Sequence, residues 1–280
     1  MPSAPLVAAN GAHVPAIGLG TWPMTGEVCV NAVSAALRSG YRHIDTAAKY
    51  GNETEVGEGL RAGGVPRKDI WVTTKVWFED IGAMQLERSA DVSLKKLGLD
   101  AVDLLLIHWP NPAIPLKDSI SALVNAKKRG LTKHIGISNF TTRMIDEAVK
   151  LSSEPLVLNQ VEYHPHLDQS KVLAACRKHG LALTAYCPLG RGSVGGVLDE
   201  KVIKDIARAH AKTAGQIALR WLVQQPGVIA VPKSATPARI AENVDVFGFS
   251  LSDDEMQRIK ALAKPDGRVV NVGFAPTWDT

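Results

Sequence analysis

The chain has 280 residues, a formal net charge of +4 and 45% hydrophobic residues. That apolar fraction fills a large core and excludes a disordered chain, and no stretch of the sequence has the basic density expected of a nucleic-acid-binding surface. Three widely spaced cysteines predict free thiols in a reducing compartment: Cys29, Cys176 and Cys187. The sequence shows no secretory signal pattern and no apolar run that could span a bilayer, so we expect a cytoplasmic protein.

Strands and helices are expected to alternate along most of the chain. First, LVAANGAHVPAI predicts a small β-hairpin that turns at Asn10-Gly11. Short apolar runs then predict eight buried strands, which end near residues 21, 46, 75, 108, 138, 161, 186 and 231. Segments with helical period separate most of them. Four of these predicted helices end in basic residues and a glycine, as helix C-termini do: Gly40, Gly98, Gly130 and Gly180.

This alternation predicts an α/β fold with a parallel sheet and right-handed crossovers. Eight units in this length fit a closed (β/α)8 TIM barrel. A doubly wound open sheet is the alternative, but it usually carries a GxGxxG fingerprint after the first strand, and GLGTWP is not one. The chain contains no linker and no low-complexity tract, so we expect a single domain over residues 1–280.

Polar residues lie at the predicted ends of three successive strands, where a barrel of this kind carries its chemistry: Asp45, Lys75 and His108. Taken singly, they could be a loop cap, a surface lysine and a core histidine. Adjacent strands are about 4.8 Å apart, however, so the three side chains can meet.

Tyr50 follows Asp45 by five residues and could complete a site for carbonyl chemistry without a metal. A buried Lys75 needs a counter-ion, which Asp45 can be. We expect the nearby ammonium to lower the pKa of Tyr50, so that this phenol gives a proton to a developing alkoxide while His108 orients the oxygen. Lys49 is nearer in sequence but is not the expected partner. Asn52, with Glu55 three residues later, is expected to cap the following helix.

The segment VPKSATPARIAENVDVF offers a phosphate site. Thr236-Pro237 predicts a helix start, with Lys233 before it and Arg239 inside it. Two cations at a helix N-terminus favour a phosphate monoester such as the 2′-phosphate of NADPH, although a solvated basic helix start is the alternative. Other strand ends carry groups suited to a nicotinamide carboxamide and ring, or to simple loop capping: Ser138, Asn139, Gln160 and Tyr186.

From about residue 6 to residue 265 the chain resembles the aldo-keto reductases, through GLGTW, GYRHIDTAAKYGNE, TTKVW, DLLLIHWP, GISNF, NQVEYHP, AYCPLG and PKSATPARIAEN. These pieces occur in that family's order, and the short loop NPAIPLKDS resembles prokaryotic members such as 2,5-diketo-gluconate reductases. The resemblance implies a barrel that binds extended NADPH, with a catalytic tetrad of Asp45, Tyr50, Lys75 and His108. It implies cofactor contacts from Thr21, Trp22, Ser138, Asn139, Gln160, Tyr186, Pro188, Leu189, Lys233, Ser234, Thr236, Arg239, Glu242 and Asn243.

Two departures from the family pattern concern the cofactor side. Cys187 stands where many members have serine. The loop GRGSVGG, residues 190–196, lacks an obvious acidic belt over the pyrophosphate, so we expect a mobile cover and quick cofactor exchange.

The expected substrates are aldehydes and ketones, including α-dicarbonyls and keto-sugars, because the pocket would be aromatic with few committed polar groups. We expect the C-terminal tail NVGFAPTWDT to fold over the site, as the resemblance implies. The expected substrate-binding residues are Trp22, Trp77, His108, Trp109 and Trp278.

Two other functions are kept as alternatives. A non-enzymatic NADPH-binding protein on the same fold would not need the intact tetrad. A metal-dependent barrel hydrolase could use His43, Asp45 and His108, but it lacks further ligands at later strand ends and leaves Lys75 and Arg239 unexplained. We therefore expect an NADPH-dependent enzyme that binds small carbonyl compounds, acts as a monomer, and uses no metal, nucleic acid or membrane.

Overall fold

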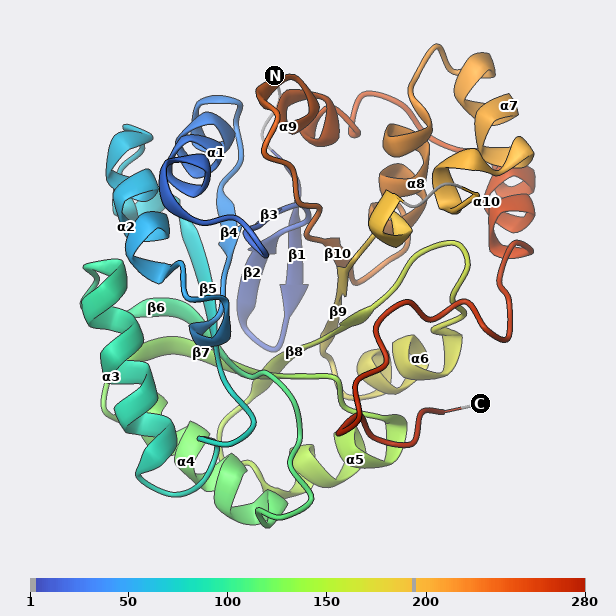
Figure 1. Cartoon of the computed structure of the whole chain (residues 1–280). Coiled ribbons are helices and arrows are strands. Elements are labelled where there is room, and N and C mark those ends of the chain that lie inside the picture. The colour runs from blue at the N-terminus through green and yellow to red at the C-terminus, as the bar shows by residue number, and fades with distance from the viewer. Residues whose placement is uncertain (1–3, 193–194, 280) are drawn as a thin grey trace.

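A barrel of eight parallel strands forms the centre of the molecule, and helices surround it (Figure 1). The computed structural model describes residues 4–192 and 195–279. Strands adjacent in the sequence are neighbours in the sheet. In order, they are β3 (Leu19–Gly20), β4 (His43–Asp45), β5 (Trp71–Val76), β6 (Val102–Ile107), β7 (Thr132–Ser138), β8 (Leu156–Glu162), β9 (Ala182–Tyr186) and β10 (Val228–Ala230).

The first and last strands of this sheet meet and close the barrel. Ile17 forms a parallel bridge with Ala230, and the Gly18 amide donates a hydrogen bond of 2.9 Å to the Ala230 carbonyl. One step further, the Gly20 amide donates to the Pro232 carbonyl at 2.9 Å. The predicted (β/α)8 barrel is thus confirmed and the open sheet is wrong. Every predicted strand end lies within one residue of the observed end.

The helices lie outside the barrel and cover its strands (Figure 1). The four predicted glycines all have a positive φ, and Gly98 forms the left-handed C-cap of the third helix at φ 67°. The α-helices are α1 (Gly26–Arg38), α2 (Glu53–Ala62), α3 (Gln85–Leu97), α4 (Leu116–Lys128), α5 (Thr142–Leu151), α6 (Ser170–Lys178), α7 (Lys201–Ala209), α8 (Ala214–Val223), α9 (Pro237–Val244) and α10 (Asp253–Lys260). Short 3₁₀ turns are η1 (Ala48–Tyr50), η2 (Arg67–Asp69), η3 (Gly190–Gly192) and η4 (Val197–Asp199).

The predicted N-terminal hairpin is also confirmed. Strands β1 (Leu6–Ala9) and β2 (Ala12–Pro15) pair antiparallel, and the turn residues Asn10 and Gly11 both have a positive φ. Apolar side chains of the hairpin pack with the barrel interior in one cluster, which includes Val14, Leu104 and Leu158. The hairpin therefore covers one end of the barrel and leaves the carboxyl ends of the strands free for a site. Among the described helices, none is both long and apolar enough to cross a membrane.

Candidate active site

Three successive strands and one short turn bring the four predicted catalytic side chains together. Asp45 is the last residue of β4, Lys75 lies near the end of β5, His108 follows β6, and Tyr50 ends η1. The Lys75 Nζ donates to Asp45 Oδ1 at 2.6 Å and lies 3.4 Å from the Tyr50 hydroxyl oxygen. The Tyr50 and His108 rings meet edge to face with centroids 5.6 Å apart. The predicted grouping is therefore observed.

The Lys75–Asp45 ion pair lies in the interior of the protein. The Lys75 side chain is 0% exposed, so the surface alternative for this lysine is wrong. Its ammonium also donates to the Thr46 carbonyl at 2.8 Å, and the second carboxylate oxygen of Asp45 accepts from Gln160 Nε2 at 2.7 Å. Since both charges are paired and hydrogen-bonded, the cost of their desolvation is offset.

Burial controls the protonation of this cluster. It raises the pKa of Tyr50 well above 10, and the negative charge of Asp45 adds to the rise, so the expectation that the lysine would lower this pKa is wrong. Burial, and then the charge of Lys75, hold the pKa of His108 well below 6.5. Burial also lowers the pKa of Lys75, against the opposing pull of Asp45. At neutral pH the phenol therefore carries its proton and the imidazole is neutral.

Asn52 was expected to cap a helix with its side chain, but that side chain instead binds the loops that follow β3 and β4. Asn52 occupies the N-cap position of α2, as predicted, but its side chain makes no capping bond. Its Oδ1 instead accepts from the Thr46 hydroxyl at 2.9 Å, and its Nδ2 donates to the carbonyls of Thr21 and Met24. This buried amide ties the chain after β3 to the chain after β4, and so positions the turn that ends in Tyr50.

Aromatic rings form the wall beside His108. The Trp77 ring lies edge to face with His108 at 5.2 Å between centroids. Phe274, from the C-terminal tail, packs against Trp77 and Trp109 at 5.6 Å each, and Trp109 contacts Trp278 at 6.0 Å. Four predicted substrate residues are thus brought together: Trp77, His108, Trp109 and Trp278. Trp22 is not part of this cluster: it is 48% exposed, and the Arg191 guanidinium lies 5.3 Å from its ring.

Two aromatic members of the wall were not expected from the sequence, Phe78 and Phe274, whose rings stack at 4.3 Å. Glu162, which binds the tail, was not expected either. Both oxygens of this fully buried carboxylate are used: they accept the Val269 and Val270 amides at 2.6 and 2.8 Å. The expectation that the tail folds over the site is confirmed. Phe274 could have been predicted as a member of the wall from its position in that tail.

Polar side chains at the next strand ends form a connected network. The Asn139 Nδ2 donates to the His108 carbonyl at 2.9 Å, and Asn139 Oδ1 accepts from the Tyr186 hydroxyl at 2.9 Å. The Ser138 hydroxyl donates to the Gln160 carbonyl at 2.8 Å. All four predicted carboxamide and ring residues are therefore in one place, next to Asp45 through the Gln160 amide.

The predicted phosphate-binding residues lie around the start of α9. Lys233 and Arg239 are exposed, and neither has a carboxylate oxygen within 4.0 Å among the residues that the structure describes. The Ser234 hydroxyl accepts from the Thr236 amide at 3.1 Å. The Glu242 carboxylate accepts a hydrogen bond of 2.7 Å from the hydroxyl of Thr213, the N-cap residue of α8. Asn243 is buried.

Comparisons with known proteins identify the family. The model of the aldo/keto reductase family matches residues 16–264. The chain belongs to the aldo/keto reductase family. It is 41% identical to glyoxal reductase of Bacillus subtilis (strain 168) over 258 residues, with 92% of each chain covered. It is 38% identical to methylglyoxal reductase DkgB of Escherichia coli O157:H7, covering 95% of this chain and 99% of the relative.

Solved structures of this family match the whole barrel. A crystal structure with the provisional name 2,5-diketo-D-gluconic acid reductase B has a TM-score of 0.96 and 46% identity, and the match covers 99% of this chain and 98% of the other. The Bombyx mori aldo-keto reductase in complex with NADP has a TM-score of 0.90 and 35% identity, with 97% and 96% covered.

The segment after β9 is where this aldo/keto reductase departs from the expected family pattern. Cys187 has φ 48°, and burial raises the pKa of its thiol. Pro188 is buried and Leu189 is half-buried beside it. The expected mobile cover at 190–196 includes residues 193–194, which lie outside the described residues, so that expectation stays a prediction.

The hydrolase alternative gains no support from the side-chain arrangement of this family member. Within residues 4–192 and 195–279, no group of three or more His, Cys, Asp or Glu residues could hold a metal ion. His43 turns to Thr73, with its Nε2 3.2 Å from the threonine hydroxyl, and Asp45 is engaged by Lys75.

Proposed function

We propose that the protein catalyses the NADPH-dependent reduction of aldehydes and ketones, including α-dicarbonyls and keto-sugars, to alcohols. The observation that carries the proposal is the placement of the Tyr50 hydroxyl between the buried Lys75 ammonium, 3.4 Å away, and the ring of His108. Tyr50 is the proton donor in this proposal. Its phenol is protonated at neutral pH because burial raises its pKa.

The other members of the tetrad support that proton transfer. Lys75 lies close enough to stabilise the phenolate that remains after Tyr50 gives up its proton, and Asp45 keeps the buried lysine paired. A neutral His108 donates one N–H to the carbonyl oxygen and so fixes the direction from which the carbonyl approaches.

Features of the site fit a reduced nicotinamide cofactor. The Thr21 hydroxyl is buried without a hydrogen-bond partner among the described residues, next to the end of β4. Two exposed cations, Lys233 and Arg239, flank a helix start, which suits a phosphate. When bound, NADPH supplies the hydride that the carbonyl carbon needs, while the proton comes from Tyr50. The proposed cofactor-binding residues are Thr21, Trp22, Ser138, Asn139, Gln160, Tyr186, Pro188, Leu189, Lys233, Ser234, Thr236, Arg239, Glu242 and Asn243.

The aromatic wall supports a broad range of carbonyl substrates. Trp77, Trp109 and Trp278 offer apolar faces with few committed hydrogen-bonding groups, so shape rather than a fixed polar pattern selects the substrate. The relatives named for glyoxal and methylglyoxal reduction agree with small dicarbonyls as members of that range.

The test is a panel of carbonyl compounds assayed with NADPH and with NADH. It includes methylglyoxal, an aromatic aldehyde and a keto-sugar, and follows loss of the reduced cofactor's absorbance. We expect turnover with several aldehydes and a preference for NADPH. Cofactor binding without turnover on any carbonyl would favour a non-enzymatic NADPH-binding protein. Stoichiometric zinc without NADPH binding would favour the hydrolase.

We also propose that the chain acts as a cytoplasmic monomer of one domain. Every residue proposed for the site comes from the same barrel, including the tail that carries Phe274 and Trp278. The three cysteines are free thiols, which suits a reducing compartment. Sedimentation at micromolar concentration tests the monomer, and a stable dimer would contradict it.

A further inference from the structure

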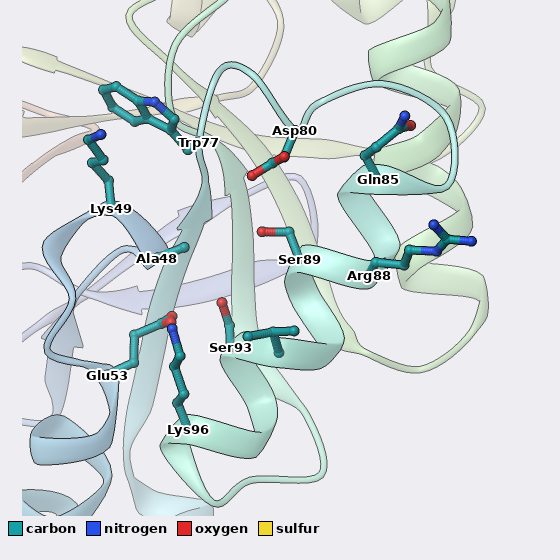
Figure 2. Close-up of a pocket in the computed structure, with 11 residues that line it drawn as sticks. Ala48, Lys49, Glu53, Trp77, Asp80, Gln85, Arg88, Ser89, Ser93 and Lys96 are labelled. Carbon is teal, nitrogen blue, oxygen red and sulfur yellow. The ribbon is translucent and has the colours of Figure 1, made fainter.

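A groove of about 460 Å³ lies beside the aromatic wall, between η1 and α3 (Figure 2). Lys49 and Trp77 stand together at one end of it, and Arg88 and Lys96 project from α3 along its other side. The two acidic residues of its lining are Asp80 and Glu53. The groove therefore carries charged side chains on a largely apolar lining, opens next to the proposed carbonyl site and shares Trp77 with it.

Lys49 is placed directly beside the reacting groups. It precedes Tyr50 within η1, and its Nζ lies 4.8 Å from the centroid of the Trp77 ring. The same ring contacts the His108 imidazole edge to face at 5.2 Å. The Trp77 ring thus contacts both the Lys49 ammonium and His108, which is proposed to orient the carbonyl. A substrate that lay along Trp77 with its carbonyl at His108 would extend toward Lys49.

The charge of Lys49 is not neutralised by a close partner. Among the residues that the structure describes, no carboxylate oxygen lies within 4.0 Å of its Nζ. Glu53 is 1% exposed and accepts from the Thr74 hydroxyl at 2.6 Å, and burial raises its pKa. Asp80 is the exposed acid of the groove. Arg88 and Lys96 add positive charge on the α3 side.

We propose that Lys49 binds the carboxylate of an anionic carbonyl substrate, so that the enzyme favours aldehyde acids and keto acids whose carboxylate lies several bonds from the carbonyl. This inference rests on the proposed function and names a specificity residue for it. The wall has another cation, Arg268, which stacks on Trp278 at 3.7 Å and lies 3.9 Å from the buried Glu162 carboxylate. Lys49 is the exposed cation at the Trp77 end, so its ammonium should dominate the discrimination between charged and neutral substrates there. A single lysine matches one carboxylate, whereas a phosphate dianion would call for a second cation, and Arg88 and Lys96 lie on the opposite side of the groove (Figure 2).

The experiment compares two substrates that share one ring and differ in charge, 4-carboxybenzaldehyde and methyl 4-formylbenzoate. The readout is the ratio of their kcat/KM values, acid over ester, in each protein. Lys49→Met keeps the length of the stem and should lower this ratio about 3- to 5-fold, the range expected for an exposed ion pair. Lys49→Glu should lower it further, and Lys49→Arg should retain it. Added salt should lower the wild-type ratio because it screens the pair.

Lys68→Met provides the matched control. Lys68 is an exposed lysine of η2, before β5 begins, so its loss changes the net charge equally but at the opposite end of the barrel. It should leave the ratio unchanged. An equal ratio in wild type, Lys49→Met and Lys49→Glu, with both compounds reduced, would overturn the inference and leave the proposed function standing. Failure of the wild type to reduce either compound or any carbonyl of the panel would overturn both.

Discussion

The buried pair of Lys75 and Asp45 allows a quantitative prediction. Asp45→Asn removes the negative charge that faces the Lys75 Nζ at 2.6 Å and leaves the ammonium with neutral acceptors such as the Thr46 carbonyl. Both side chains are almost fully buried, at 0% and 4% exposed. Leaving one buried charge without its partner costs about 3 to 5 kcal/mol in the free energy of unfolding. Lys75→Met should cost a similar amount, because it strands the carboxylate instead.

The double variant Asp45→Asn/Lys75→Met separates this coupling from simple loss of packing. It buries no unpaired charge, so its loss of stability should be smaller than the sum of the two single losses by at least about 3 kcal/mol. Urea denaturation at neutral pH measures all four proteins. Each single variant should also lose at least about 100-fold in kcat, since both residues support the proton donor. Losses of stability that simply add would refute the reasoning about the pair.

Three further outcomes are expected. Burial lowers the pKa of His43 from its ordinary value near 6.5 to about 4. Between these two values the unfolded chain binds a proton on His43 and the folded protein does not. Stability should therefore fall by about 3 kcal/mol between pH 6.5 and pH 4, and His43→Gln should flatten that fall in urea titrations. A Cβ on Gly57 would lie 2.3 Å from the Leu97 carbonyl oxygen, so Gly57→Ala should cost about 1 to 3 kcal/mol, whereas Gly248→Ala has no atom within 4 Å and should cost little. Arg239→Ala should weaken NADPH binding about 10-fold, with little effect on NADH, in fluorescence titrations.

Each of these has a contradicting result. A pH profile that is the same in wild type and His43→Gln would assign the acid sensitivity to other groups. Equal stability of the two alanine variants would show that the close approach of α2 to α3 is relieved by a small shift. Equal weakening for both cofactors would place Arg239 away from the 2′-phosphate.

The sequence predicted the barrel well because the signals were local and repeated. A basic helix end, a glycine and an apolar run recur, and the glycines at 40, 98, 130 and 180 all adopt a positive φ. The tetrad followed because strand ends in a parallel barrel converge, which brings Asp45, Lys75 and His108 together whatever lies between them.

The predictions that were wrong or missing concern properties that depend on the three-dimensional environment of a side chain rather than on its position in the sequence. The pKa of Tyr50 was expected to fall because Lys75 is near, but burial outweighs that charge and raises it. Asn52 was expected to cap a helix, but its amide finds three partners in neighbouring strand-end loops. Glu162 gave no signal for its role in the tail, since the two tail amides that donate to it lie more than a hundred residues away. Such three-dimensional contacts leave no short-range pattern in a sequence.

Replacement of Tyr50 by phenylalanine tests the central claim most directly. The assay measures turnover of a reactive aldehyde with NADPH, together with quenching of tryptophan fluorescence by the cofactor. Tyr41→Phe is the matched control, because it removes another buried phenol hydroxyl, at the far end of β4, that has no hydrogen-bond partner among the described residues. We expect Tyr50→Phe to lose at least about 100-fold in kcat and still to bind NADPH, while Tyr41→Phe keeps its activity. Wild-type turnover in Tyr50→Phe would contradict the claim.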